Sequence, residues 1–85
     1  MTKAYTVIGR QNCRFCSMAL EDLTAMGKCA IYHDITADSA LKTLLVMAGF
    51  RTVPQVFSPE GHHIGGYYGL VGYLVGEDED PSVIE

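Results

Sequence analysis

Two cysteines, Cys13 and Cys16, are separated by two residues and lie where a strand pattern gives way to a helix pattern. The strand pattern, at residues 4–8, is a short run of apolar, β-prone side chains that ends at Gly9. From Phe15 onward, apolar residues recur at helical spacing. Any fold assigned to the chain therefore has to place a Cys-x-x-Cys pair at the start of its first helix.

Length and charge restrict the classes of protein to which the chain can belong. Its 85 residues form one domain at most, with a small core. A formal net charge of -4 argues against nucleic acid as a partner, because phosphates attract basic surfaces. No apolar run is long enough to span a membrane or to act as a signal peptide. We therefore expect a cytoplasmic monomer with no membrane partner.

Helix and strand patterns alternate through the first half of the chain. The first helix ends at Gly27, and a second strand follows at residues 29–35. Thr36 or Asp38 can cap a second helix, which ends at Gly49. The apolar positions that define these helices are Cys16, Ala19, Leu20, Leu23 and Met26 in the first, and Leu41, Leu44, Leu45 and Ala48 in the second.

The second half of the chain predicts a hairpin followed by a third helix. Strands at residues 55–58 and 62–65 flank a Pro-Glu-Gly turn, and the helix begins at Gly66. The apolar residues of this helix are Leu70, Tyr73 and Leu74. We assign residues 1–76 to one domain and expect residues 77–85 to be a mobile acidic tail.

The predicted order of elements, β-α-β-α-β-β-α, places the chain in the α/β class. A strand-helix-strand start favours a parallel pair with a right-handed crossover. The hairpin then adds an antiparallel pair. We therefore expect a four-stranded mixed sheet with helices packed on its faces.

The cysteine pair fits thiol–disulfide exchange. A Cys-x-x-Cys motif beside a strand-helix-strand pattern is typical of thioredoxin-like redox proteins. Cys13 would lie at the N-terminus of the helix, where backbone N–H groups and the helix dipole favour a thiolate. Arg14, and Arg10 further upstream, add positive charge nearby. Cys16 falls on the apolar stripe, so we expect Cys13 to attack a disulfide and Cys16 to resolve the mixed disulfide.

A zinc site and a pair of unreactive thiols are the other roles that the motif allows. Zinc needs four ligands, usually in two closely spaced pairs. The remaining candidate ligands do not repeat this spacing, and they are Cys29, His33, His62 and His63. We therefore expect no metal, and we expect Cys29 to be a small buried hydrophobe at the start of the second strand.

Two further motifs connect the chain to a known family. Thr-Val-Pro at residues 52–54 precedes the third strand, and Gly65 and Gly66 precede the last helix. Together with the Cys-x-x-Cys pair, these motifs resemble those of glutaredoxins in order and spacing over residues 4–75. Residues 53–70 look most like the small glutaredoxins encoded by bacteriophages, which would place the protein in the host cytoplasm.

The resemblance implies a thioredoxin fold in which a cis peptide precedes Pro54 and this turn faces the cysteine pair. The backbone of Val53 would then pair with the cysteine of glutathione. The two glycines would let glutathione approach, and the start of the last helix would bind its γ-glutamyl carboxylate. The implied substrate- and glutathione-binding residues are Arg14, Phe15, Arg51, Thr52, Val53, Pro54, Gly65, Gly66 and Tyr67.

The chain departs from the common glutaredoxin pattern at two places. Arg14 and Phe15 stand where the family usually has proline and tyrosine, and loss of the proline should loosen the helix start and change the redox poise. The family also usually has an acidic residue after the glycine pair, which grips the amino group of glutathione. Tyr67, Tyr68 and Gly69 occupy that stretch here.

The resulting hypothesis is a dithiol, glutaredoxin-like oxidoreductase with glutathione as its co-substrate and a disulfide-containing protein as its partner. Ribonucleotide reductase is the protein substrate that the resemblance suggests. Two alternatives stay open. Residues 48–54 also resemble redoxins that take electrons from thioredoxin reductase, and some glutaredoxin-like chains without the motif proline hold an iron–sulfur cluster between two subunits.

Overall fold

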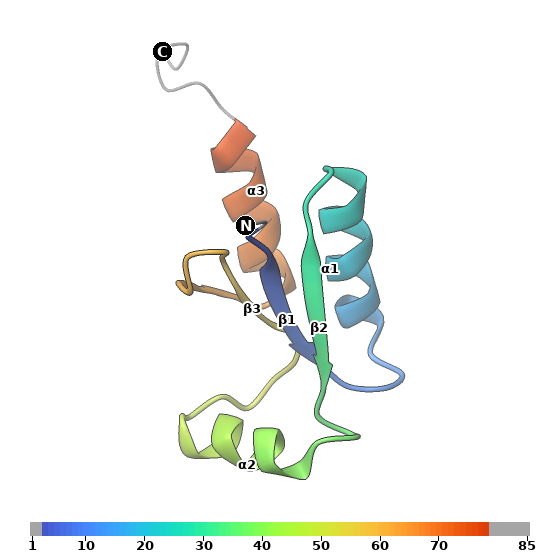
Figure 1. The fold of residues 1–85 in the computed structure, drawn as a ribbon, viewed down its shortest axis with the longest axis vertical. Coiled ribbons are helices and arrows are strands. Elements are labelled where there is room, and N and C mark those ends of the chain that lie inside the picture. The colour runs from blue at the N-terminus through green and yellow to red at the C-terminus, as the bar shows by residue number, and fades with distance from the viewer. Residues whose placement is uncertain (1–2, 79–85) are drawn as a thin grey trace.

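The computed structural model describes residues 3–78 and shows a four-stranded sheet with three helices (Figure 1). In chain order the elements are β1 (Tyr5–Gly9), α1 (Arg14–Ala25), β2 (Ala30–Asp34), α2 (Ser39–Met47), β3 (Gln55–Phe57), β4 (His63–Gly65) and α3 (Tyr67–Asp78). Residues 77 and 78, expected to begin an acidic tail, belong to α3. The rest of that tail lies outside the described residues.

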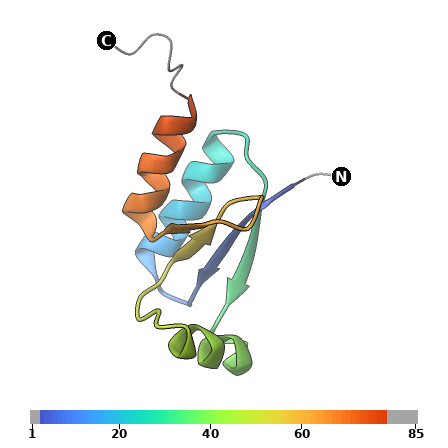
Figure 2. The same cartoon turned by 90° about the vertical axis from the view of Figure 1, so that its left-hand side faces the viewer.

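The sheet has the mixed topology that the sequence predicts. The strand order is β2-β1-β3-β4, with β1 parallel to β2 and antiparallel to β3, and with β3 antiparallel to β4. Figure 2 shows the crossover helix α1 and the last helix α3 side by side against the sheet. The carboxyl ends of β1 and β4 and the amino end of β3 consequently meet at one edge.

Local sequence signals explain where the helices begin and end. The side chain of Cys13 caps α1, and the side chain of Asp38 caps α2 by accepting the N–H of Leu41 at 3.0 Å. Gly27 and Gly49 follow the two helices with φ angles of 73° and 90°. These left-handed conformations are easy for glycine and strained for other residues.

The core lies between the sheet and the pair α1 and α3. Its buried residues are Tyr5, Val7, Ala19, Leu23, Val56, Leu70 and Leu74. Leu23 and Leu70, one from each helix, are both completely buried. Burying a leucine side chain stabilises a fold by about 1.5–3 kcal/mol, so these positions hold the helices on the sheet.

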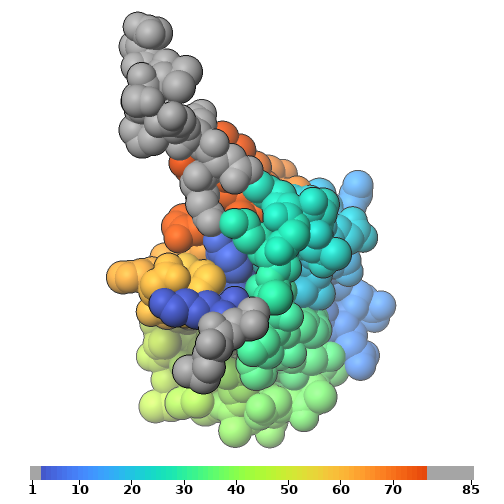
Figure 3. Space-filling view, turned by 45° about the horizontal axis from the view of Figure 1, so that its top comes forward, coloured from blue at the N-terminus to red at the C-terminus, as the bar shows by residue number. Residues whose placement is uncertain are grey.

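The second helix does not pack as its apolar stripe suggested. Leu44 is 62% exposed, Ala48 is also exposed, Leu41 is half-buried, and Leu45 is the buried residue of α2. The helix lies across the ends of β1 and β2 (Figure 1), and its green atoms occupy the lower end of the molecule in the space-filling view (Figure 3). Because α2 covers an end of the sheet and not a face, it fully buries a single side chain, that of Leu45.

The prediction that Cys29 is a buried residue is also wrong, because the structure shows it exposed. It lies one residue before β2, between the turn at Gly27 and the first paired residue, Ala30. Its carbonyl oxygen accepts the backbone N–H of Tyr5 at 2.9 Å, but its side chain is outside the core.

Among residues 3–78, no helix is long and apolar enough to cross a membrane.

Candidate active site

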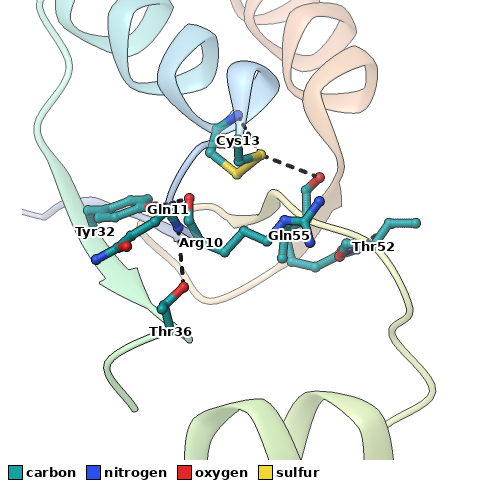
Figure 4. The surroundings of a disulfide bond; sticks show 9 residues. Arg10, Gln11, Cys13, Tyr32, Thr36, Thr52 and Gln55 are labelled. Atoms are coloured by element: carbon teal, nitrogen blue, oxygen red, sulfur yellow. Dashed lines mark hydrogen bonds between the residues drawn. A yellow bond between two sulfur atoms is a disulfide. The ribbon is translucent and has the colours of Figure 1, made fainter. Parts of the chain in front are cut away.

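A disulfide joins Cys13 and Cys16 at the N-terminus of α1, with the two Cα atoms 5.2 Å apart (Figure 4). Asn12, at a left-handed φ of 59°, turns the chain after β1 into the helix. The Sγ atom of Cys13 accepts the backbone N–H of Cys16 at 3.2 Å. The helix cap is therefore the sulfur atom itself, in a position where N–H groups and the helix dipole stabilise negative charge.

The two cysteines differ in exposure. Cys13 is half-buried, whereas Cys16 is 2% exposed. A Cβ atom on Gly9 would lie 2.8 Å from both Cys16 Sγ and the hydroxyl oxygen of Tyr32, so Gly9 leaves room for both groups. Partial burial and the nearby charge of Asp34 raise the pKa of Tyr32. Only Cys13 is open to an incoming disulfide.

The Thr-Val-Pro turn faces the disulfide, and its Val53–Pro54 peptide bond is cis, as the family resemblance implied. The carbonyl oxygen of Val53 lies 4.0 Å from Cys13 Sγ, although the two residues are 40 positions apart. Pro54 is buried, and Val53 is half-buried. An extended segment placed at Val53 would thus lie beside the sulfur atom of Cys13.

A groove of about 620 Å³ continues from this turn, between the loop after β1, α2 and the segment before β3. It is lined by Arg10, Ile35, Lys42, Leu45, Val46, Gly49, Phe50, Arg51, Thr52 and Val53. Three of these residues are cations and none is acidic, so the groove suits an anionic ligand. Figure 4 shows Arg10 and Thr52 on the α2 side of the disulfide.

The family resemblance implied Arg51, Thr52 and Val53 as binding residues, and the structure places them in the lining of this groove. The sequence analysis did not assign Arg10 and Lys42 to ligand binding. Arg10 lies three residues before Cys13, so its place in the loop after β1 was a usable signal. Lys42 sits on the second helix, where a lone exposed lysine carries no signal. The groove depends on how α2 crosses the end of the sheet, which the sequence did not predict.

Three aromatic rings gather where α1 and α3 begin. The ring of Phe15 is 5.6 Å from that of Tyr67 and 5.8 Å from that of Tyr68. The hydroxyl of Tyr67 donates to Asp22 Oδ2 at 2.8 Å, and this hydrogen bond is the main reason that the pKa of Tyr67 is raised. Arg14 is exposed in the first turn of α1. Phe15, which lies between the two cysteines in sequence, therefore connects the start of α1 to the tyrosines of α3.

The glycine pair connects the turn at Pro54 to α3. Gly65 has a φ of 121°, which favours glycine, and a Cβ atom on Gly66 would lie 3.5 Å from the carbonyl oxygen of Pro54. Gly69 is more restricted, because a Cβ there would lie 2.8 Å from the carbonyl oxygen of Ile64. The close approach of α3 to β4 thus disfavours a side chain at Gly69, in the stretch where the family usually has an acidic residue.

Among the described residues 3–78, no group of three or more His, Cys, Asp or Glu side chains is placed to hold a metal ion. The site brings together a dithiol pair, a cis-proline turn and a cationic groove. This arrangement can carry out sulfur chemistry through Cys13 while the turn and the groove hold an anionic thiol compound.

Comparison with protein families gives an assignment consistent with this geometry. Residues 3–64 match the family model described as Glutaredoxin. The chain belongs to the glutaredoxin family. A search of curated proteins finds no match. The glutaredoxin family and the Cys13–Cys16 disulfide together identify the chain as a thiol–disulfide oxidoreductase.

Solved glutaredoxins have the same fold. Wheat glutaredoxin is 27% identical with a TM-score of 0.72, covering 87% of this chain and 74% of that one. A complex of buckwheat glutaredoxin with glutathione is 26% identical with a TM-score of 0.71, covering 86% and 69%. The solution structure of glutaredoxin from Brucella melitensis is also 26% identical with a TM-score of 0.71, covering 91% and 83%. These likenesses confirm the predicted thioredoxin fold.

Proposed function

We propose that this glutaredoxin reduces protein disulfides and glutathione mixed disulfides, with glutathione as the electron donor. The observation that carries the proposal is that the accessible sulfur, Cys13 Sγ, lies 4.0 Å from the Val53 carbonyl at the end of the cationic groove. Glutathione is an anionic tripeptide with a central cysteine. The structurally similar buckwheat glutaredoxin has been solved as a complex with glutathione.

The groove and the start of α3 account for the two ends of the tripeptide. The glycyl carboxylate binds among Arg10, Lys42 and Arg51, which are the cations that line the groove. The backbone of Val53 pairs with the cysteine residue of glutathione and brings its sulfur to Cys13. The γ-glutamyl end lies toward Gly66 and the N-terminus of α3, where first-turn backbone N–H groups, which have no partner within a helix, donate to its carboxylate.

The reaction begins when the Cys13 thiolate attacks one sulfur of a substrate disulfide. The substrate S–S bond breaks, one substrate thiolate leaves, and a mixed disulfide forms on Cys13. Cys16 then loses its proton and attacks Cys13 Sγ, which releases the second substrate thiol and closes the Cys13–Cys16 bond. One glutathione thiolate reopens this bond at Cys13, and a second removes the glutathionyl group as oxidised glutathione.

Each part of the site has a separate task in these steps. The Cys16 N–H and the start of α1 stabilise the thiolate on Cys13. Burial keeps Cys16 away from solvent thiols until the mixed disulfide lies next to it. Glutaredoxins have reduction potentials of about -200 to -230 mV, close to the potential of the cytosolic glutathione pool, so glutathione can complete the cycle. A cytoplasmic disulfide enzyme such as ribonucleotide reductase is the proposed protein substrate.

Oxidation of NADPH coupled through glutathione and glutathione reductase, with a small glutathione mixed disulfide as substrate, tests the proposal. Cys13→Ser should abolish turnover. Cys16→Ser should retain reduction of the mixed disulfide, because a second glutathione can resolve Cys13 directly, but it should lose reduction of a protein disulfide. Turnover with thioredoxin reductase and none with glutathione would overturn the donor assignment in favour of the redoxin alternative.

The cationic groove can be tested with a charge-matched pair of variants. Arg51→Gln should raise KM for glutathione, by up to about fivefold, since an exposed ion pair contributes about 0.2–1 kcal/mol. Lys3→Gln makes the same change in net charge outside the groove and should leave KM unchanged. Equal effects of the two variants would show that overall charge, and not the groove, attracts glutathione.

A further inference from the structure

A buried glutamine connects the edge strand β4 to the turn that faces Cys13. Gln55 is 5% exposed, and its Nε2 donates to the carbonyl oxygen of Thr52 at 2.9 Å and to Thr52 Oγ1 at 3.2 Å. Its Oε1 lies 2.7 Å from Nε2 of His63. The side chains of three residues from two strands and a loop therefore form one continuous hydrogen-bonded path (Figure 4 shows its Thr52 and Gln55 end).

The protons along this path can be assigned from the chemistry of its atoms. A carbonyl oxygen only accepts, so the Gln55 atom that faces Thr52 has to be the amide nitrogen. The amide oxygen of Gln55 then faces His63 and has to receive a proton. His63 consequently carries a proton on Nε2, in its neutral form as in its charged form.

His63 is an exposed residue, and two phenylalanine rings pack against its ring. Its centroid is 4.8 Å from that of Phe50 and 5.1 Å from that of Phe57. The rings of Phe50 and Phe57 are themselves 6.5 Å apart in an edge-to-face arrangement. Phe50 also lines the cationic groove. His63 therefore contacts a residue of the groove wall and also Gln55, whose amide binds Thr52 at the end of the groove.

We propose that His63 is a positioning residue for substrate binding. Its Nε2–H holds the Gln55 amide in the one orientation that lets it bind Thr52, and Thr52 in turn fixes the backbone of Val53 beside Cys13. This inference rests on the proposed function, in which Val53 pairs with the backbone of the substrate. His63 itself does not touch the sulfur atoms, so it acts on binding and not on the attack.

The test separates the hydrogen bond of His63 from its packing. His63→Phe keeps a ring between Phe50 and Phe57 but removes the donor. His63→Gln removes the ring but keeps an amide N–H that can reach Gln55. His62→Phe is the matched control, because no hydrogen bond or ring contact within residues 3–78 involves the His62 side chain. KM and kcat are measured with a glutathionylated peptide, and unfolding by urea checks that each variant is folded.

The proposal predicts a split between the kinetic constants. His63→Phe should raise KM about fivefold, the equivalent of one hydrogen bond of about 1 kcal/mol, with kcat unchanged because uniform binding is lost. His63→Gln and His62→Phe should retain the KM of the unaltered protein. The rate at which iodoacetamide alkylates Cys13 should be the same in all four proteins, since the helix start is not altered.

Other results overturn the inference. A raised KM in His63→Gln with an unaltered KM in His63→Phe would show that the ring packs and the hydrogen bond does not matter. Nitrogen-15 shifts of the imidazole that place the proton of the neutral ring on Nδ1 would also contradict it. An unaltered protein with no activity toward the peptide would refute the proposed function itself, whereas normal activity with no effect in either His63 variant would refute only the role of His63.

Discussion

Gly69 and Gly72 lie on the same helix, and replacing each by alanine should change stability in different ways. Alanine gains about 1 kcal/mol over glycine in a helix. A Cβ atom at Gly72 meets nothing within 4 Å, so Gly72→Ala should stabilise the protein by about that amount. A Cβ atom at Gly69 would lie 2.8 Å from the carbonyl oxygen of Ile64, a backbone atom that cannot move without disturbing β4.

Overpacking of this kind costs about 1–3 kcal/mol, so Gly69→Ala should be between neutral and about 2 kcal/mol less stable than the unaltered protein. Both variants gain the same helix propensity from alanine. The difference between their free energies of unfolding, about 1–3 kcal/mol, therefore measures the cost of the contact with Ile64. Urea unfolding of the oxidised proteins, followed by circular dichroism, should separate the two midpoints by about 1–3 M for an m value of about 1 kcal/mol/M, the low end of the range for small proteins. Equal stabilities would refute the close approach of α3 to β4, and with it our reason for the missing acidic residue.

Two further substitutions test the surroundings of the cysteine pair. Gly9→Ala should destabilise the protein by about 1–3 kcal/mol in urea unfolding, because the new Cβ would lie 2.8 Å from Cys16 Sγ and from the Tyr32 hydroxyl; unchanged stability would show that this space is not filled. Tyr67→Phe removes the hydrogen bond to Asp22. Since the pKa of Tyr67 is raised above 10.0, that stabilisation is complete below pH 10 and is lost as the pH rises through the raised pKa. The stability gap between variant and unaltered protein should therefore be present at pH 7 and close in strong alkali, and a gap independent of pH would contradict this.

Much of the fold could be predicted because the apolar positions that define the helices in the sequence are mostly the positions that are buried in the structure. Leu23 and Leu70 have helical spacing on α1 and α3 and are both fully buried. The second helix shows where this reasoning stops. Leu44 follows the same periodicity as Leu45, yet it is 62% exposed, because periodicity identifies an apolar stripe but does not say how much of it a neighbouring surface covers.

The parts of the site that belong to sequence motifs could be predicted. The parts that only the tertiary structure brings together could not. The cysteine pair and the cis bond before Pro54 follow from sequence motifs. Lys42 lines the groove only because α2 crosses the end of the sheet. His63 and Gln55 are eight residues apart on adjacent strands, but a polar pair in a short hairpin gives no sign that it reaches the turn at the active site.

The topology explains why these pieces gather at one edge of the molecule. β4 runs antiparallel to β3, as does β1, so β1 and β4 point the same way. The loops that leave both strands therefore lead directly into α1 and α3, and the N-termini of these helices lie at the same edge of the sheet. The cis-proline turn enters β3 from this edge as well, and its Val53 carbonyl comes within 4.0 Å of Cys13 Sγ. Because a helix N-terminus favours negative charge, the strand directions place together the two helix starts that the proposed function uses, one for the thiolate of Cys13 and one for a bound carboxylate.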